Sequence, residues 1–203
     1  FRATLTMLGI IIGVGAVITM LAAGAGAQKR IDDQIASLGA NILTVNASNF
    51  FAGGISRDRQ TLIIDDANSL RGDGRYLDAV VPEMQARGQL KLDNLNTNAR
   101  LTGTTYEYAK IFNYKLAMGR FFSLAEDEER RRVVVLGAEI PQRLETEPAK
   151  LLGKVLSVNG QPFEVIGIFG SIGGGFGNQS PDSSAFIPLR TAEQRVLGRK
   201  QLD

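Results

Sequence analysis

The stretch "LTMLGIIIGVGAV" (residues 5–17) decides how the first part of this chain folds. Its composition fits a glycine-rich phosphate loop, a buried helix of a soluble domain, a signal peptide or the beginning of a membrane span. No residue between Arg2 and Lys29 is charged, and a helix of about 26 residues is roughly 39 Å long. That length exceeds the hydrocarbon core of a bilayer, which is about 30 Å thick. The run therefore favours a membrane-spanning helix.

Each of the other interpretations fits the stretch less well. A phosphate loop requires a preceding strand and a glycine-rich turn that opens a helix, whereas Gly13 and Gly15 lie inside an isoleucine-rich run. Ala25 and Ala27 form a cleavage pattern, but the apolar run is longer than the roughly 7–15 residues typical of a signal peptide. Cleavage after Ala27 and a buried helix of a soluble protein stay open as alternatives.

The helical pattern continues beyond the apolar run. Ile31, Ile35 and Leu38 recur at helical spacing, and a glycine follows them as a stop signal. One helix over residues 4–38 explains both parts, with a transmembrane helix over 1–28 and a stalk over 29–40. Because the sequence starts at Phe1 rather than Met, we expect it to be a fragment or a processed product of a longer protein.

Small residues give this helix two further candidate features. Gly9 and Gly13 are four positions apart, so they share a helical face on which a second helix could approach closely in lipid. The alternative is a span that is simply rich in small residues. Gly24 and Gly26 weaken the helix where the stalk begins, which makes them candidates for a hinge.

The composition argues against catalysis by this chain. The sequence contains no cysteine and no histidine, which excludes disulfides, thiolate sites, histidine metal sites and Ser-His-Asp chemistry. We predict no catalytic, cofactor-binding or metal-binding residues. Lys and Arg number 23 against 21 Asp and Glu, with no basic stripe, so no nucleic-acid partner is expected. The dense run "EDEERRR" (126–132) predicts an exposed turn or helix end with local ion pairs.

After residue 40 the pattern changes to short strands and turns. A first strand is predicted over 41–47, a long polar loop over 46–60, and a short helix capped by Asp65 or Asp66 that ends near Gly72. A strand over 77–84 completes a βαβ-like layer. A hairpin over 84–104 should turn around Asn94, Asn96 and Asn98.

The second half predicts further elements. Residues 105–122 read as a helix whose Tyr106, Tyr108, Phe112 and Leu116 lie in the core. A buried strand within 131–140 leads through Gly137 into a helix, and Asn159-Gly160 predicts a hairpin over 154–170. The loop over 170–184 is glycine-rich but leads to a strand over 185–189, so a mobile loop is favoured over a phosphate cradle.

Several blocks in order resemble one family. "LTMLGIIIGVGAVITMLAAGAGAQKRIDDQIASLGANILTV", "YKLAMGRFF", "RRVVVLGAEI", "LLGKVLSVNGQPFEVIGIF" and "AFIPLRTAEQRVLG" are similar to macrolide-exporter-like (MacB/FtsX-type) ABC transporter permeases. The segment "RLETEPAKLLGK" departs from the family's pattern, in which a compact Leu-Phe-Gly stretch commonly precedes Leu-Gly-Lys. The resemblance implies an α+β fold: the transmembrane and stalk helix, then an extracytoplasmic domain with a porter-like βαβ part and an inserted β-rich lobe. The porter-like part would comprise residues 41–104 and 185–203, and the lobe residues 105–184.

The resemblance also implies a function. The chain would be a permease subunit that transmits cytoplasmic ATP-driven motion to the extracytoplasmic domain and so expels substrate. The implied partners in the membrane are an ABC ATPase domain or subunit that binds ATP, a second permease copy and the lipid bilayer. A periplasmic adaptor and an outer-membrane channel are further candidate partners. The chain would lie in the cytoplasmic (inner) membrane, mostly on the periplasmic or extracellular side, with no cofactor of its own.

Two alternative functions remain at this stage. The same architecture could regulate a cell-wall hydrolase without any cargo, or the chain could be a secreted binding module released after Ala27. In either membrane-bound case, exposed polar loops are the expected contact sites for partner proteins. The candidate residues in these loops are Asn49, Phe50, Phe51, Gly174 and Phe176.

Overall fold

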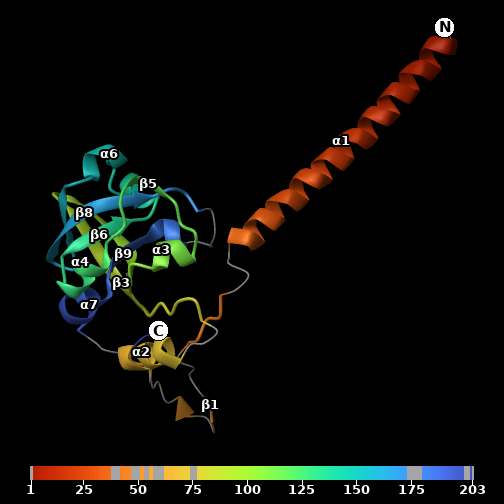
Figure 1. The fold of residues 1–203 in the computed structure, drawn as a ribbon. Helices are drawn as coiled ribbons and strands as arrows, with labels where there is room; N and C mark the ends of the chain where they lie inside the picture. The colour runs from red at the N-terminus through yellow and green to blue at the C-terminus, as the bar shows by residue number, and fades with distance from the viewer. Residues whose placement is uncertain are drawn as a thin grey trace. The chain divides into compact units, whose positions relative to one another are not determined.

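The computed structural model describes residues 2–37, 42–46, 51–52, 55–56, 62–73, 77–172, 180–198 and 202. The chain divides into two compact units, Phe1–Ile42 and Leu43–Asp203, and each is described by itself. The prediction of a long helix followed by an α+β domain is confirmed (Figure 1).

The first unit consists of one uninterrupted helix, α1 (Arg2–Ser37). The part from Arg2 to Lys29 is long and apolar enough to cross a membrane. Within it, the Thr19 hydroxyl donates to the Gly15 carbonyl oxygen at 2.7 Å, and the Thr6 hydroxyl bonds similarly to Ala3. Such bonds satisfy polar side chains inside the helix, as a lipid environment requires. The predicted helix over 4–38 is confirmed across its described residues.

The second unit combines strands with short helices. Its strands are β1 (Phe51–Ala52), β2 (Ile55–Ser56), β3 (Glu83–Leu92), β4 (Leu95–Thr104), β5 (Leu116–Gly119), β6 (Val133–Leu136), β7 (Val155–Val158), β8 (Gln161–Phe169) and β9 (Ser184–Pro188). Its helices are α2 (Ile64–Asp73), α3 (Tyr108–Ile111), α4 (Leu124–Glu128), α5 (Ile140–Arg143), α6 (Pro148–Leu151), η2 (Pro181–Ser183), α7 (Leu189–Thr191) and the π-helix η3 (Ala192–Leu197).

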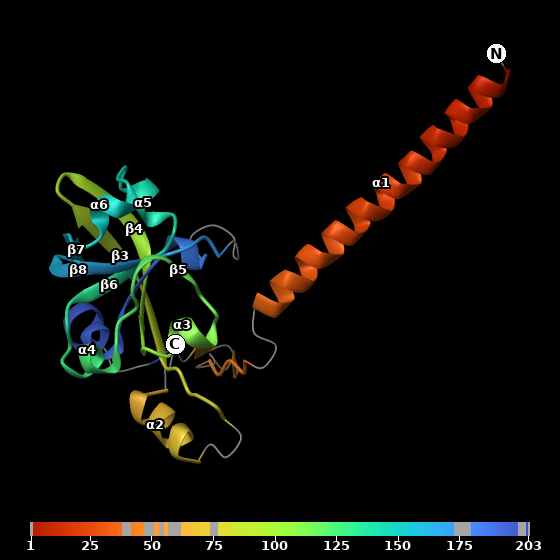
Figure 2. The same cartoon turned by 45° about the horizontal axis from the view of Figure 1, so that its top comes forward.

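The main sheet closes on itself. Its seven strands follow the order β5-β8-β6-β9-β4-β3-β7, and β7 pairs in addition with β8 (Figure 2). Six strands therefore form a ring, β8-β6-β9-β4-β3-β7, and β5 is added to β8 beside it. The pairs β4–β9 and β6–β8 are parallel, and the other pairs are antiparallel. Ring closure leaves few free strand edges among these elements.

The ring encloses the larger hydrophobic core. Alternate residues of each ring strand belong to this core, as expected when one face of a strand points inward. These residues are Leu90, Leu92, Ala99, Leu101, Val134, Leu136, Leu156, Val158, Phe163, Val165, Ala185 and Ile187. Ile140 of α5, Leu144 directly after α5, and Leu151 of α6 add to this core.

A second, aromatic core covers the outside of β6 and β9. Phe186 packs against Tyr108 and Phe169, with ring centroids 5.4 Å and 5.1 Å apart. All four residues of β6 are buried, which explains why it reads as a continuous run of valines. Burial raises the pKa of Tyr108 and of Tyr114, so both phenols stay neutral in this cluster.

Several predicted elements are confirmed. The Asn159-Gly160 turn joins β7 and β8, with φ of 47° and 82° at the two residues. β6 leads through Gly137 to α5, and β9 coincides with the short predicted strand.

Other predictions about local structure are wrong. Residues 42–46 and 77–82 form no strand, and β1 and β2 pair within the predicted loop over 46–60. Asp65 and Asp66 lie in the first turn of α2 rather than before it, but the predicted capping role is confirmed for Asp66, whose carboxylate accepts a hydrogen bond of 2.9 Å from the Ile63 N–H. Asn96 and Asn98 lie within β4, because the hairpin turns at Asp93, whose φ is 51°.

The predicted helix over 105–122 is also wrong. This segment contains only the one-turn helix α3, which is followed by β5. Asn113 adopts φ of 52° and so ends the helical path. Tyr108 is buried, and Phe112 and Leu116 pack against the same aromatic cluster, but Tyr106 is exposed.

The division into a porter-like part and an inserted lobe stays a prediction. Strands from the predicted porter-like part and from the predicted lobe share one sheet, since β3 pairs with β7 and β9 pairs with β6.

Candidate functional site

The part of α1 from Arg2 to Lys29 exposes large apolar side chains along its length. Exposed large side chains include Met7, Ile10, Ile11, Ile12, Val14, Val17, Ile18, Met20 and Leu21. A Cβ built at Gly9, Gly13, Gly24 or Gly26 meets no other atom within 4 Å. These four glycines are therefore unobstructed in a single chain, and their roles in helix packing and hinge motion stay predictions.

The predicted partner-contact loops are only partly described. Asn49, Phe50, Gly174 and Phe176 lie outside the described residues. Phe51 begins β1, the first strand of the small β1–β2 ladder. The role of these residues as contacts stays a prediction.

The end of the second loop is not the mobile segment that its composition predicts. Ser180, Asp182, Ser183 and Ser184 are buried. The Asp182 carboxylate accepts hydrogen bonds from the Ser171 hydroxyl at 3.1 Å and from the Ile172 N–H at 2.9 Å. Asp182 thus holds both sides of the loop together at its base.

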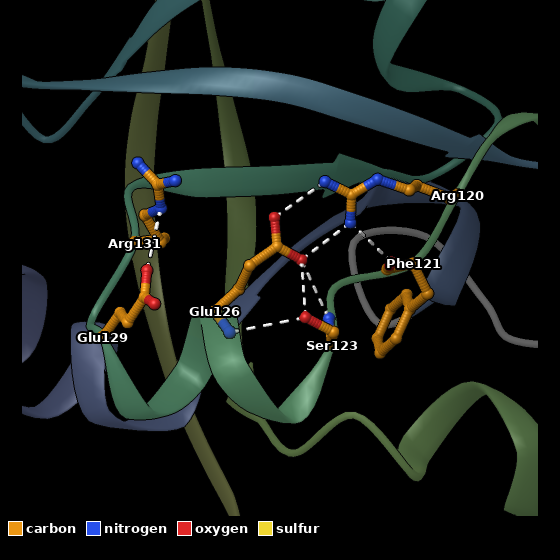
Figure 3. Close-up of polar contacts among 6 residues, drawn as sticks. All are labelled: Arg120, Phe121, Ser123, Glu126, Glu129 and Arg131. Carbon is orange, nitrogen blue, oxygen red and sulfur yellow. Dashed lines mark hydrogen bonds and ion pairs between the residues drawn. The ribbon is translucent and has the colours of Figure 1, made fainter.

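A polar network caps the N-terminus of the short helix α4 (Figure 3). Both carboxylate oxygens of Glu126 accept hydrogen bonds of 2.7 Å from the Arg120 guanidinium. Glu126 also accepts from the Ser123 N–H at 2.9 Å, and its own N–H donates to the Ser123 hydroxyl, which completes a capping box. The Arg120 hydrogen bonds lower the pKa of Glu126 to about 2, and the pairing raises the pKa of Arg120.

Asp127, the residue after Glu126, connects α4 to a distant part of the chain. Asp127 is buried, and its carboxylate accepts a hydrogen bond of 3.0 Å from the Arg190 N–H at the start of α7. The Thr191 hydroxyl donates back to the Arg131 carbonyl oxygen at 3.0 Å. Desolvation by burial raises the pKa of Asp127, while its bond to Arg190 opposes that shift. Together, Asp127 and Thr191 join the end of α4 and the residues after it to α7.

The charged run 126–132 therefore agrees only partly with its prediction. The local pair between Arg131 and Glu129 is present at 3.2 Å, but Asp127 is buried instead of exposed. The sequence analysis missed Asp127 and Asp182. Nothing in their local sequence distinguishes them from solvated acids, because the groups they bind are 63 and 10 residues away.

These polar groups position segments of the chain and do not converge on one reaction centre. Among the described residues, no group of three or more His, Cys, Asp or Glu could hold a metal ion. A shallow depression of about 410 Å³ lies at the end of the ring, lined by Lys91, Asp93, Val155, Leu156, Ser157, Gly160 and Pro162.

Sequence comparisons relate the whole chain to exporter proteins. The macrolide export ATP-binding/permease protein MacB of Bdellovibrio bacteriovorus is 34% identical over 205 residues, which cover 100% of this chain and 31% of that protein. MacB of an Azoarcus species is 36% identical, over 100% of this chain and 30% of its own length. The pyoverdine export ATP-binding/permease protein PvdT of Pseudomonas entomophila is 31% identical, over 98% and 30%. The chain thus spans about a third of these relatives.

Solved structures share the fold. The periplasmic region of MacB from Actinobacillus actinomycetemcomitans matches with a TM-score of 0.67 and 28% identity, over 82% of this chain and 73% of that one. The extracellular domain of the transporter YknZ from Gram-positive bacteria matches with a TM-score of 0.59 and 22% identity, over 71% of each chain, which indicates the fold alone. The family described as the MacB-like periplasmic core domain matches residues 3–202, and this chain belongs to that family.

Proposed function

We propose that this chain is the first membrane helix and the periplasmic core of an ABC exporter permease, and that it transmits ATP-driven movement from the membrane to the periplasmic core. The continuity of α1 is the observation that supports this mechanism. The helix continues for eight residues beyond Lys29, the end of the apolar span, to Ser37. Because a helix is stiff over a few turns, displacement of the span moves the stalk with it.

The proposed location follows from the division of the chain into an apolar helix and a separate α+β unit. Residues 2–29 cross the cytoplasmic membrane, and the unit Leu43–Asp203 lies on the periplasmic side. The names of the relatives include an ATP-binding part, so we assign ATP hydrolysis to an ATPase domain or subunit outside this chain. A second permease copy completes the proposed membrane assembly, and an adaptor with an outer-membrane channel would carry the substrate onward.

The substrate class is proposed from the relatives. Their names specify export of macrolides and of pyoverdine, which are large molecules with many polar groups. A macrolide is therefore the first substrate to test.

Helix continuity can be tested in the full-length protein. Gln34→Pro breaks the stalk at a cost of about 3 kcal/mol or more, and Gln34→Ala is the matched control that keeps the helix. We expect the proline variant, reconstituted with its ATPase, to hydrolyse ATP but to lose export of erythromycin. Unchanged export by the proline variant would refute transmission through the stalk.

A second experiment, deletion of the gene, separates export from control of a cell-wall hydrolase. Deletion of the gene should raise macrolide sensitivity if the protein is an exporter. A defect in cell separation with unchanged macrolide sensitivity would instead support the regulatory function. Recovery of a mature chain that begins at Gln28 would support the secreted module.

The stalk hinge is a separate part of the proposal. Gly24 and Gly26 each cost a helix roughly 1 kcal/mol relative to alanine, so bending is easiest near them. Gly24→Ala combined with Gly26→Ala should stiffen the helix and lower the number of substrate molecules exported per ATP hydrolysed. An unchanged ratio would remove the hinge from the mechanism.

A further inference from the structure

Two arginines lie directly opposite each other on the β3–β4 hairpin. The register pairs Arg87 of β3 with Arg100 of β4, and directly opposite residues have Cβ atoms about 5 Å apart on the same face. Inward-facing neighbours on both strands, such as Leu90 and Leu101, are buried in the ring core. The arginines therefore belong to the outer face, where like charges in this arrangement are unfavourable.

The surrounding side chains neutralise this charge only in part. Arg100 donates a hydrogen bond of 3.0 Å to the Gln85 side-chain oxygen, which is an uncharged acceptor. Arg87 is exposed, and no described residue forms a hydrogen bond or ion pair with it. On this face, Glu83 lies beyond Gln85 at the other end of the hairpin.

The cationic face continues toward the hairpin turn. Lys91 is exposed and lies four residues after Arg87, so both project from the same face, roughly 13 Å apart along the strand. Between and opposite them lie the amide side chains of Gln89, Asn96 and Asn98, which are exposed. The face therefore presents cations and hydrogen-bonding groups at the two-residue period of a strand.

Lys91 also borders the shallow depression. The registers place Lys91 beside Ser157 of β7, and Ser157 beside Pro162 of β8, so the three residues form one row across the outside of the ring. Val155 has 61% of its surface exposed and lines the same depression, as does Asp93 at the turn. An apolar contact is thus available next to the last cation of the face.

We infer that the outer face of the β3–β4 hairpin binds an extended, acidic segment of a partner protein. Carboxylates at alternate positions of an extended chain repeat about every 6.7 Å, so positions four residues apart match the spacing of Arg87 and Lys91. One carboxylate pairs with Arg87 and Arg100 together and relieves their repulsion. The next matching carboxylate reaches Lys91, and an adjoining apolar side chain lies on Val155.

The binding test needs no export assay and so is independent of the proposed function. The full-length protein in phosphatidylcholine nanodiscs is titrated into a fluorescein-labelled decapeptide in which glutamate alternates with threonine, and anisotropy is measured at low salt. The double variant Arg87→Gln with Lys91→Gln should weaken binding at least tenfold. The control Lys110→Gln removes an exposed cation on α3, away from this face, and should change binding less than twofold.

A second readout keeps the test valid if a variant loses structure. Without peptide, Arg87→Gln should slow hydrogen exchange of the β3 and β4 amides, because it removes the repulsion across the ladder. Faster exchange would mean that Arg87 supports the fold and would overturn the inference.

The remaining outcomes also decide the question. Equal binding of a peptide with glutamine in place of glutamate, or an equal loss in the Lys110→Gln control, would overturn recognition of an acidic segment by this face. Displacement of the peptide by phosphatidylglycerol vesicles of matched charge would assign the face to a lipid surface and likewise overturn it.

Discussion

The side chain of Asn159 joins the β7–β8 turn to Gln89 on β3. The side-chain oxygen of Asn159 accepts a hydrogen bond of 2.9 Å from the Gln89 backbone N–H, and the backbone N–H of Asn159 donates to the Gln89 carbonyl oxygen at 2.9 Å. The β3–β7 ladder itself contains only the pairs Leu90↔Val158 and Lys91↔Ser157. Asn159 therefore extends the junction that closes the ring.

Substitution of Asn159 should separate its two roles. Asn159→Gly keeps the left-handed turn but removes the side-chain acceptor, at a cost of about 1 kcal/mol. Asn159→Ala adds roughly 1–2 kcal/mol of backbone strain, since φ is 47° at this position. Hydrogen exchange of the β7 amides in the full-length protein should accelerate about fivefold in the first variant and more in the second. Unchanged exchange in Asn159→Gly would show that the side chain does not hold the ring closed.

Glu126 should make the second unit sensitive to acid. Its pKa in the folded state is about 2, against an ordinary value of 4.5, so the folded state favours the ionised carboxylate. This contribution to stability is fully present above about pH 4.5 and is lost as the pH falls toward 2. A fragment that spans residues 43–203 should therefore lose less stability over this pH range when it carries Glu126→Gln.

The size of the effect is limited by exposure. The Arg120 side chain has 58% of its surface exposed, and exposed ion pairs contribute little. Loss of the capping box in Glu126→Ala should lower the free energy of unfolding by about 1 kcal/mol at pH 7. Urea unfolding monitored by tyrosine circular dichroism measures both variants, and an identical pH profile for wild type and Glu126→Gln would contradict the assignment.

Asp127 should respond to pH in the opposite direction. Burial raises its pKa in the folded state, so its contribution to stability is greatest below the unfolded value of 3.8 and declines as the pH rises through the folded value. Asp127→Asn keeps an acceptor for the Arg190 N–H and removes the charge, so it should be neutral or stabilising at pH 7. Asp127→Ala leaves that N–H without its acceptor and should cost about 1–3 kcal/mol.

The comparison of the two Asp127 variants decides between the acceptor and the charge. Thr191→Val is a matched variant, because it removes the bond to the Arg131 carbonyl oxygen without changing any charge. Urea unfolding of the same fragment at pH 7 provides the measurement. An equal loss in Asp127→Asn and Asp127→Ala would mean that the ionised carboxylate is required.

The features that were predicted correctly from sequence depend on neighbouring residues. The uncharged run up to Gln28 dictates a helix without reference to the rest of the chain, and Asn159-Gly160 dictates a turn because both residues accept a positive φ. The alternation along β7 and the first half of β8 likewise reflects one buried face.

The features that were missed depend on distant contacts. Residues 105–122 have helical spacing, but Asn113 turns the chain so that Leu116 and Met118 can pair with β8. Asp127 looks like its solvated neighbours until Arg190 covers it. The opposition of Arg87 and Arg100 appears only once the hairpin register is known. Tertiary pairing, which local sequence does not encode, decides each of these cases.

The π-helix η3 lies close against β4 at Gly103. A Cβ at this position would overlap the Cβ of Ala192, so Gly103→Ala forces the helix away from the sheet. We expect a loss of about 1–3 kcal/mol in unfolding free energy. Gly72→Ala is the control, because a Cβ there meets nothing within 4 Å and alanine favours the helix. A loss in the control as large as in Gly103→Ala would mean that glycine flexibility, rather than close packing, explains the result.

Gly13 offers a direct test of helix association in the membrane. A Cβ at Gly9 or Gly13 meets no atom in this chain, and leucine is a better helix former than glycine, so Gly13→Leu should not harm α1 itself. Any loss of assembly must then come from a partner helix, for which we expect a weakening of 1 kcal/mol or more, about fivefold in the dimerisation constant. Gly15→Leu is the control, because it lies about 200° around the helix from Gly13.

Energy transfer between labelled copies of the full-length protein in bilayers measures the dimer fraction. Equal fractions for wild type and Gly13→Leu would show that the Gly9–Gly13 face does not mediate dimer formation.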